Sequence, residues 1–210
     1  MTTPAYRYPS DVAFSPAVKA MQTRFGSRKL YARVEREHGW GVALDPEIEA
    51  FVEAQISAFL ATASADGQPY VQHRGGPPGF LRVLDARTIA FADFIGNQQY
   101  ITLGNLSENP RAQLLLVDYA RRRRVKIWGR ARVVDDDPAL LDKLMAPGYK
   151  ARAARAIVFT VEAWDLNCPQ HIPQRFEAAD VKAALDQRDA RIRELEAEVA
   201  RLKGAGAHAA

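Results

Sequence analysis

Between residues 58 and 163, short apolar segments with the two-residue period of β-strands alternate with turns. Short turns at 65–67 and 85–87 join neighbouring segments as hairpins, so those strands are expected to be antiparallel. Antiparallel strands with helices covering the ends predict a small Greek-key β-barrel in an α+β domain. The predicted strands are 58–64, 70–74, 80–84, 88–94, 114–119, 125–134 and 156–163.

The segment 125–134 has two chemically different faces, because side chains alternate along a strand. One face carries Val125, Ile127, Gly129, Ala131 and Val133, and the other carries Arg124, Lys126, Trp128, Arg130 and Arg132. A cationic and aromatic face indicates contact with something other than solvent. The alternative is a solvated outer face with one exposed tryptophan.

Cap signals place helices around the strands. Ser15-Pro16 predicts a helix near 16–25, and Asp45-Pro46 predicts one from 46 to about 57. Asp137-Pro138 opens a third helix that ends near Met145. The predicted organisation is an N-terminal arm and helix (1–45), a barrel domain (46–176), a heptad-patterned helix (177–204) and a frayed tail (205–210).

The heptad pattern of the C-terminal helix leaves one narrow apolar seam on a charged surface. Three heptads are marginal alone, so the helix either pairs between two subunits or lies on its own barrel. The seam residues are Val181, Leu185, Arg188, Ile192, Leu195, Val199 and Leu202.

Composition narrows the classes of function. The net charge of +4 is modestly basic and favours phosphorylated ligands over a dedicated nucleic-acid protein. The single cysteine, Cys168, fits a reducing compartment and is expected to be a small buried residue rather than a catalytic thiol. The histidines lack metal-site spacing, and no segment has transmembrane or signal-peptide character, so we expect a cytoplasmic protein without a metal site.

The predicted strand 88–94 is followed by Gly96 and Asn97, and a helix is predicted directly after them at 98–108. Asn97 is a suitable N-cap, and the N–H groups of a helix start favour a phosphate. The alternative is an ordinary strand-to-helix turn.

Several motifs between 66 and 110 occur in a characteristic order: Asp66-Gly67-Gln68-Pro69, Gln72-His73-Arg74, Gly96-Asn97, Thr102 and Asn109-Pro110. In this order and spacing they resemble the pyridoxamine 5′-phosphate oxidase-like family of FMN-binding split barrels. The resemblance continues through the strand that contains Trp128 and Arg130. The segments 74–80 and 167–171 resemble a flavin-binding subgroup rather than the vitamin-processing oxidase.

The resemblance implies an FMN cofactor and a homodimer. It implies that Gln72, His73, Arg74 and Gly75 follow the flavin ring, that Asn97 and Thr102 lie at the phosphate, and that Trp128 and Arg130 lie near a subunit interface that holds the flavin. Gln98 and Gln99 stand where a basic residue is common in the family. The phosphate cation is therefore expected to be Arg74 or Arg124.

These features predict an FMN-dependent oxidoreductase acting on a small molecule, with His73 or His171 as candidates for proton transfer and a structural role for each as the alternative. An NAD(P)H donor, if used, would bind without a Rossmann domain, since the sequence has no GxGxxG motif after a strand. A second interpretation is a flavin carrier without turnover. A third is a nucleic-acid-binding protein using Arg121–Arg124, although these arginines lie too far from the heptads to form one basic helix.

Overall fold

The structure is a computed structural model that describes residues 7–37, 39–167 and 169–207. Predictions for residues 1–6, for Cys168 and for 208–210 lie outside the described residues. The chain divides into two compact units. The first is Met1–Asp118 with Arg123–Pro169, and the second is Tyr119–Arg122 with Gln170–Ala210.

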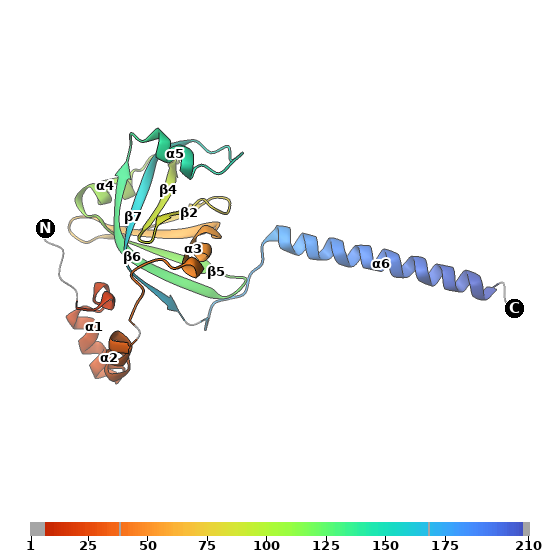
Figure 1. Cartoon of the computed structure of the whole chain (residues 1–210), viewed down its shortest axis with the longest axis horizontal. Coiled ribbons are helices and arrows are strands. Elements are labelled where there is room, and N and C mark those ends of the chain that lie inside the picture. The colour runs from red at the N-terminus through yellow and green to blue at the C-terminus, as the bar shows by residue number, and fades with distance from the viewer. Residues whose placement is uncertain (1–6, 38, 168, 208–210) are drawn as a thin grey trace. The chain divides into compact units, whose positions relative to one another are not determined.

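The first unit contains seven strands and most of the helices, and the second contains one long helix (Figure 1). The elements are η1 (Pro9–Val12), α1 (Pro16–Arg24), α2 (Arg28–Glu37), α3 (Pro46–Glu53), β1 (Ser57–Ala63), β2 (Pro69–Gly75), β3 (Arg82–Asp85), β4 (Thr88–Phe94), α4 (Ile101–Glu108), β5 (Arg111–Asp118), β6 (Arg123–Val134), α5 (Pro138–Leu144), β7 (Ala153–Asn167) and α6 (Ala178–Ala207).

The strands form one seven-stranded sheet in the order β2-β1-β5-β6-β7-β4-β3, and every neighbouring pair is antiparallel. The sheet curls. As a result, Arg74 on the edge strand β2 reaches Asp93 on β4, near the opposite edge, and forms an ion pair with it. The predicted α+β class and antiparallel arrangement are confirmed.

Rows of directly paired residues define the inner face of the sheet. Leu60, Leu114 and Ile127 are paired across β1, β5 and β6, and all three are fully buried. Directly opposite residues in antiparallel strands project to the same side, so this row marks the core. The predicted apolar face of β6 is therefore the inner face, and its cationic and aromatic face is the outer one.

Helix α4 covers the barrel beside this core. The Asn105 amide donates a hydrogen bond to Thr62 Oγ1 over 3.0 Å, and both residues are buried. This contact joins α4 to β1 because a buried amide needs a partner that replaces water. The helix is therefore held in a fixed position relative to the strands.

The N-terminal helices follow the predicted caps. The side chain of Ser15 accepts from the N–H of Val18 at the start of α1, and that of Asp45 accepts from Ile48 at the start of α3. Helix α3 ends at Glu53, earlier than the predicted end near residue 57. Strand β1 already begins at Ser57, so the chain between them turns instead of continuing the helix.

An aromatic contact attaches the N-terminal region to the outside of the barrel. The rings of Trp40 and Trp128 stack with centroids 4.6 Å apart and an interplanar angle of 17°. Phe14 meets the edge of Trp40 at 5.1 Å and that of Tyr31 at 5.4 Å. The aromatic residue on the outer face of β6 is thus covered by the chain's own N-terminal region.

The second unit consists mainly of α6, a single helix of 30 residues. It continues to Ala207, beyond the predicted end at 204. Among the helices that the structure describes, none has the length and hydropathy needed to cross a membrane.

Candidate functional site

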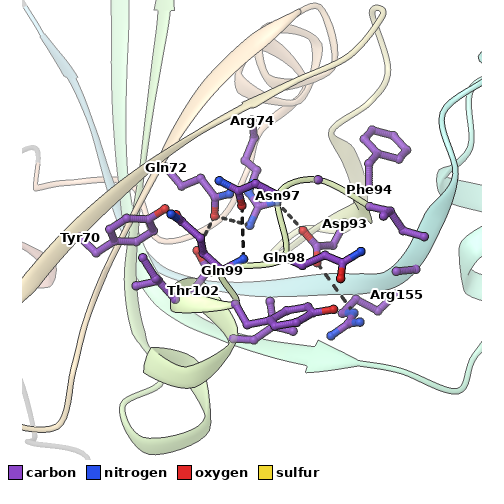
Figure 2. Close-up of a pocket in the computed structure, with 16 residues that line it drawn as sticks. Tyr70, Gln72, Arg74, Asp93, Phe94, Asn97, Gln98, Gln99, Thr102 and Arg155 are labelled. Carbon is purple, nitrogen blue, oxygen red and sulfur yellow. Dashed lines mark hydrogen bonds and ion pairs between the residues drawn. The ribbon is translucent and has the colours of Figure 1, made fainter.

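A cavity of about 410 Å³ lies where β2, the end of β4, the loop 95–100, the start of α4 and the start of β7 meet. Figure 2 shows the polar side chains that surround it, with Gln72 and Arg74 from β2 near Asp93 from β4 and Arg155 from β7. The cavity therefore takes residues from strands near both ends of the curled sheet.

Strand β2 presents alternate residues to this cavity. Tyr70, Gln72 and Arg74 line it. Gln72 and Arg74 are paired with the buried Leu60 and Ala58, so they project to the inner face of the sheet.

His73 projects to the opposite face and does not line the cavity. Its Nε2 lies 2.9 Å from Ser57 Oγ, and its ring meets the edge of Phe59 at 5.7 Å. Gly75 does not line the cavity either. A Cβ on Gly75 would lie 3.0 Å from the His73 ring and 3.2 Å from the Ile56 carbonyl, so glycine permits packing within the chain at this position.

Two arginines share one carboxylate in the wall of the cavity. Arg74 and Asp93 form an ion pair in which both side chains are nearly buried, with 11% and 12% exposed. Arg155 Nε lies 3.9 Å from the other carboxylate oxygen of Asp93. Arg155 Nε also lies 3.6 Å from Asp135 Oδ1, so two carboxylates face the two arginines. The Nε atoms of Arg74 and Arg155 are nevertheless buried and have no hydrogen-bond partner among the described residues. Unused guanidinium donors beside a cavity favour an anionic ligand.

Gln72 links this charged cluster to α4. Its Oε1 accepts from Arg74 Nη2 over 2.8 Å and from Thr102 Oγ1 over 2.6 Å. With the oxygen so engaged, the amide NH₂ of Gln72 is the group left to donate to a ligand. Thr102 is 2% exposed, and its hydroxyl holds the Gln72 side chain in place in the cavity wall.

The loop 95–100 has an unusual backbone. Gln98 and Tyr100 have φ values of 58° and 56°, in the left-handed region that non-glycine residues rarely adopt. Strain of this kind persists only when the surroundings hold it, and it is common at functional sites. Both residues line the cavity.

The prediction that Asn97 caps the following helix is wrong. The left-handed residues delay the helix until Ile101, and the N-cap position falls on Tyr100, whose side chain makes no capping hydrogen bond. Asn97 Oδ1 instead accepts from the N–H of Gln99 over 3.3 Å. Asn97 still lines the cavity, as does Thr102.

Arg124, Trp128 and Arg130 lie on the outer face of β6 and do not line this cavity. Trp128 stacks on Trp40, and Arg130 Nε donates to Glu162 Oε1 over 2.9 Å. The sheet itself separates them from Gln72 and Arg74. Within one chain, the predicted site residues therefore form two groups on opposite faces, and a role for the outer group in flavin binding stays a prediction.

His171 belongs to the second unit, has a left-handed backbone (φ 63°) and does not line the cavity. Of the two histidines predicted as proton-transfer candidates, neither is a cavity residue. Within the described part of the chain, no three acidic, histidine or cysteine residues cluster as a metal site.

Sequence reasoning missed Asp93 and Arg155. The sequence carries a signal for Asp93, because it is a charged residue inside the apolar segment 88–94. Arg155 is recognisable only from the strand pairing that places it opposite Asp93. Its guanidinium also lies 5.7 Å from the centre of the Tyr100 ring, which ties β7 to the strained loop.

Comparison with known proteins agrees with the fold. The family model described as pyridoxamine 5′-phosphate oxidase matches residues 44–168. None of the curated proteins is similar enough in sequence to match the chain.

Three solved structures illustrate the similarity. HupZ of Group A Streptococcus is 19% identical over 63% of this chain and 98% of its own, with a TM-score of 0.48. A putative pyridoxamine 5′-phosphate oxidase from Lactobacillus delbrueckii is 21% identical over 60% and 95%, with a TM-score of 0.46. An FMN-binding protein from Syntrophomonas wolfei is 14% identical over 70% and 97%, with a TM-score of 0.46. With a family model that spans more than half of its residues, the chain belongs to the pyridoxamine 5′-phosphate oxidase-like FMN-binding family of split barrels.

Proposed function

We propose that this protein binds FMN and holds the phosphate-bearing end in the cavity between β2 and the loop 95–100. The observation that carries the proposal is the pair of arginines in the cavity lining, Arg74 and Arg155, whose buried Nε atoms have no hydrogen-bond partner among the described residues. Arginine matches the geometry of a phosphate group and forms paired hydrogen bonds with it. The cavity volume of about 410 Å³ is within the usual range for small-molecule sites.

The remaining groups suit the rest of such a ligand. The amide NH₂ of Gln72 is available to donate, and the Tyr70 side chain forms part of the wall. The outer face of β6 around Arg130, beside the Trp128 that Trp40 covers, is the surface that we propose for a second subunit of a homodimer. Because the sheet separates the two groups of predicted residues within one chain, a flavin would contact both groups where the cavity of one subunit meets the outer face of β6 of the other.

We propose further that the protein is an oxidoreductase acting on a small molecule. FMN supplies two-electron transfer when bound, and the chain supplies binding, orientation and charge. Arg74 and Arg155 fix the phosphate, which leaves the ring end directed away from the charged cluster. Activity assays with candidate substrates and with electron donors such as NAD(P)H would identify the reaction.

A second candidate function is a flavin carrier without turnover. The observation that favours it is that no histidine is among the residues that line the cavity, and Asp93 is engaged by arginine. Rapid mixing of the FMN-loaded protein with NADH or NADPH separates the two functions. Flavin bleaching that is faster than for free FMN supports the enzyme, and an unchanged rate with every donor supports the carrier.

Ligand titration tests the binding site itself. We expect FMN to bind more tightly than riboflavin, which lacks the phosphate, by about 1.5–3 kcal/mol, or on the order of tenfold to a hundredfold in Kd. Flavin fluorescence measures both affinities. Members of this family commonly bind FMN or F420, so F420 belongs in the same series.

Matched arginine variants assign the effect to the cavity. Arg155→Ala should remove most of the preference for FMN over riboflavin, because it removes one of the two cations. Arg193→Ala removes an exposed arginine from α6, which contributes no residue to the cavity, and should leave the preference unchanged. Equal affinities for FMN and riboflavin in the unmodified protein would contradict a phosphate site.

A further inference from the structure

The apolar seam of α6 is uncovered in the described chain. Its side chains retain between 44% and 57% of their accessible surface. These residues are Val181, Leu185, Ile192, Leu195, Val199 and Leu202. Apolar side chains repeated at this spacing on a long helix are typical of a helix that packs against another helix.

We propose that the seam binds a second copy of the same helix as a parallel, in-register, two-stranded coiled coil. In heptad notation, Leu185, Ile192 and Val199 occupy the a positions, and Leu195 and Leu202 occupy d positions. β-Branched residues at a with leucine at d favour parallel dimers. Two of the three a residues are β-branched, so the core composition points to this arrangement.

The flanking charges match a parallel pair. In that geometry each g residue faces the e residue five positions further along the other helix. Arg191 then faces Glu196 of the second copy, and Glu198 faces Lys203. Both contacts are attractive, and two-fold symmetry forms each of them twice.

An antiparallel pair would bring like charges together. When a and d layers are opposed in that orientation, the e residues of the two helices become neighbours. Asp189 then lies beside Glu196, and Lys182 lies beside Lys203. These two contacts are repulsive, whereas the g residues Arg191 and Glu198 would attract each other. Repulsive contacts outnumber attractive ones in the antiparallel pair, and both flanking contacts of the parallel pair are attractive, so the charge pattern favours the parallel orientation.

Arg188 occupies the d position that interrupts the seam, and it fixes the register. A d side chain packs beside the e residue of the other helix, which here is Asp189. The g residue that would face Asp189 is Ala184, so its carboxylate has no opposing charge at the flank. In register the two Arg188 side chains share one layer, and each lies beside Asp189 of the other helix, which offsets the like charges. A shift by one heptad would instead bury Arg188 against an apolar residue.

Existing ion pairs on α6 compete only weakly with these contacts. Arg191 lies 2.9 Å from Glu194, and Arg201 lies 3.6 Å from Glu198, both within one helix. Each of these side chains is more than half exposed. Exposed pairs within a helix contribute a few tenths of a kcal/mol. They can therefore be shared with, or replaced by, contacts to a second helix.

Disulfide cross-linking of the full chain tests orientation and register. In a Cys168→Ser background, Leu185→Cys and Leu202→Cys each introduce one cysteine near opposite ends of the seam. A parallel, in-register pair brings each cysteine to its own counterpart, so mild oxidation should give covalent dimers of both variants on a non-reducing gel. Ala197→Cys lies at an f position facing away from the seam and sets the background.

Other outcomes overturn the proposal. No dimer above the Ala197→Cys background for either variant would show that the seam does not hold a second copy. Cross-linking only when Leu185→Cys and Leu202→Cys chains are mixed would show an antiparallel pair.

Charge exchange provides an independent test in the Leu202→Cys chain. Arg191→Glu or Glu196→Arg alone should slow cross-linking, because each creates like charges between the helices. The double exchange restores opposite charges and should restore the rate. A double variant slower than either single variant would exclude the proposed pairing of Arg191 with Glu196.

Discussion

At the scale of single residues, the cavity wall depends on hydrogen bonds that converge on one amide oxygen. Gln72 Oε1 accepts from both Arg74 and Thr102, so two elements of the fold are oriented through one acceptor. A buried hydroxyl that loses its partner must be compensated or it costs stability. Thr102 therefore contributes to the site by positioning Gln72, whatever contact it makes with a ligand.

Thr102→Val keeps the shape of this side chain and removes the hydroxyl. We expect the free energy of unfolding to fall by about 1 kcal/mol, the usual net contribution of one hydrogen bond. Urea denaturation measures the change. Thr160→Val alters an exposed strand residue and should have little effect. An unchanged midpoint for Thr102→Val would mean that the 2.6 Å contact is not stabilising.

At the scale of elements, the strands and helices were predictable because their periodicity and caps are local. The arrangement of the site was less so. Glutamine and tyrosine rarely adopt a left-handed backbone, so nothing in the sequence indicated this conformation at Gln98 and Tyr100. The start of the helix was therefore predicted too early. The pairing of Arg155 with Asp93 joins distant parts of the chain, and only the folded sheet reveals it. The two faces of β6 were predicted from its alternation, and the structure places the cationic and aromatic face on the outside of the barrel.

The N-terminal elements should show a specific dependence on pH. Burial alone would raise the pKa of Asp11, but hydrogen bonds from Lys19 and from the backbone N–H groups of Tyr8 and Arg7 outweigh it and lower the pKa below 3.8. The ionised form is therefore favoured by folding. Its contribution is present above pH 3.8 and is lost as the pH falls through the lowered pKa.

Asp11→Asn should accordingly destabilise the protein near about pH 7, and the difference from the unmodified chain should shrink below pH 3.8. Urea unfolding over a pH series tests this expectation. Asp142→Asn changes an exposed carboxylate on α5 and serves as the control. A difference that stays constant down to about pH 3 would show that ionisation of Asp11 is not involved.

At the scale of the whole molecule, the two units separate the cavity from the heptad helix. Every residue that lines the cavity belongs to the first unit. Removing 178–210 should therefore weaken a dimer without abolishing FMN binding, since we propose a separate interface on the outer barrel face. Sedimentation and flavin titration of the shortened and full chains at equal concentration measure the two effects. A shortened monomer that no longer binds FMN would mean that the tail builds the site.

The ion pair between Arg74 and Asp93 has a further consequence for motion. It joins β2, an edge strand of the sheet, to β4 near the opposite edge, and the same arginine lines the cavity. Opening of β2 from the sheet must break both its pairing with β1 and this ion pair, and it would dismantle the cavity wall in the same event. Because a ligand that binds only the closed form slows such opening in proportion to its occupancy, amide hydrogen exchange along β2 should report how full the cavity is. Hydrogen exchange at this edge strand therefore measures ligand occupancy of the cavity.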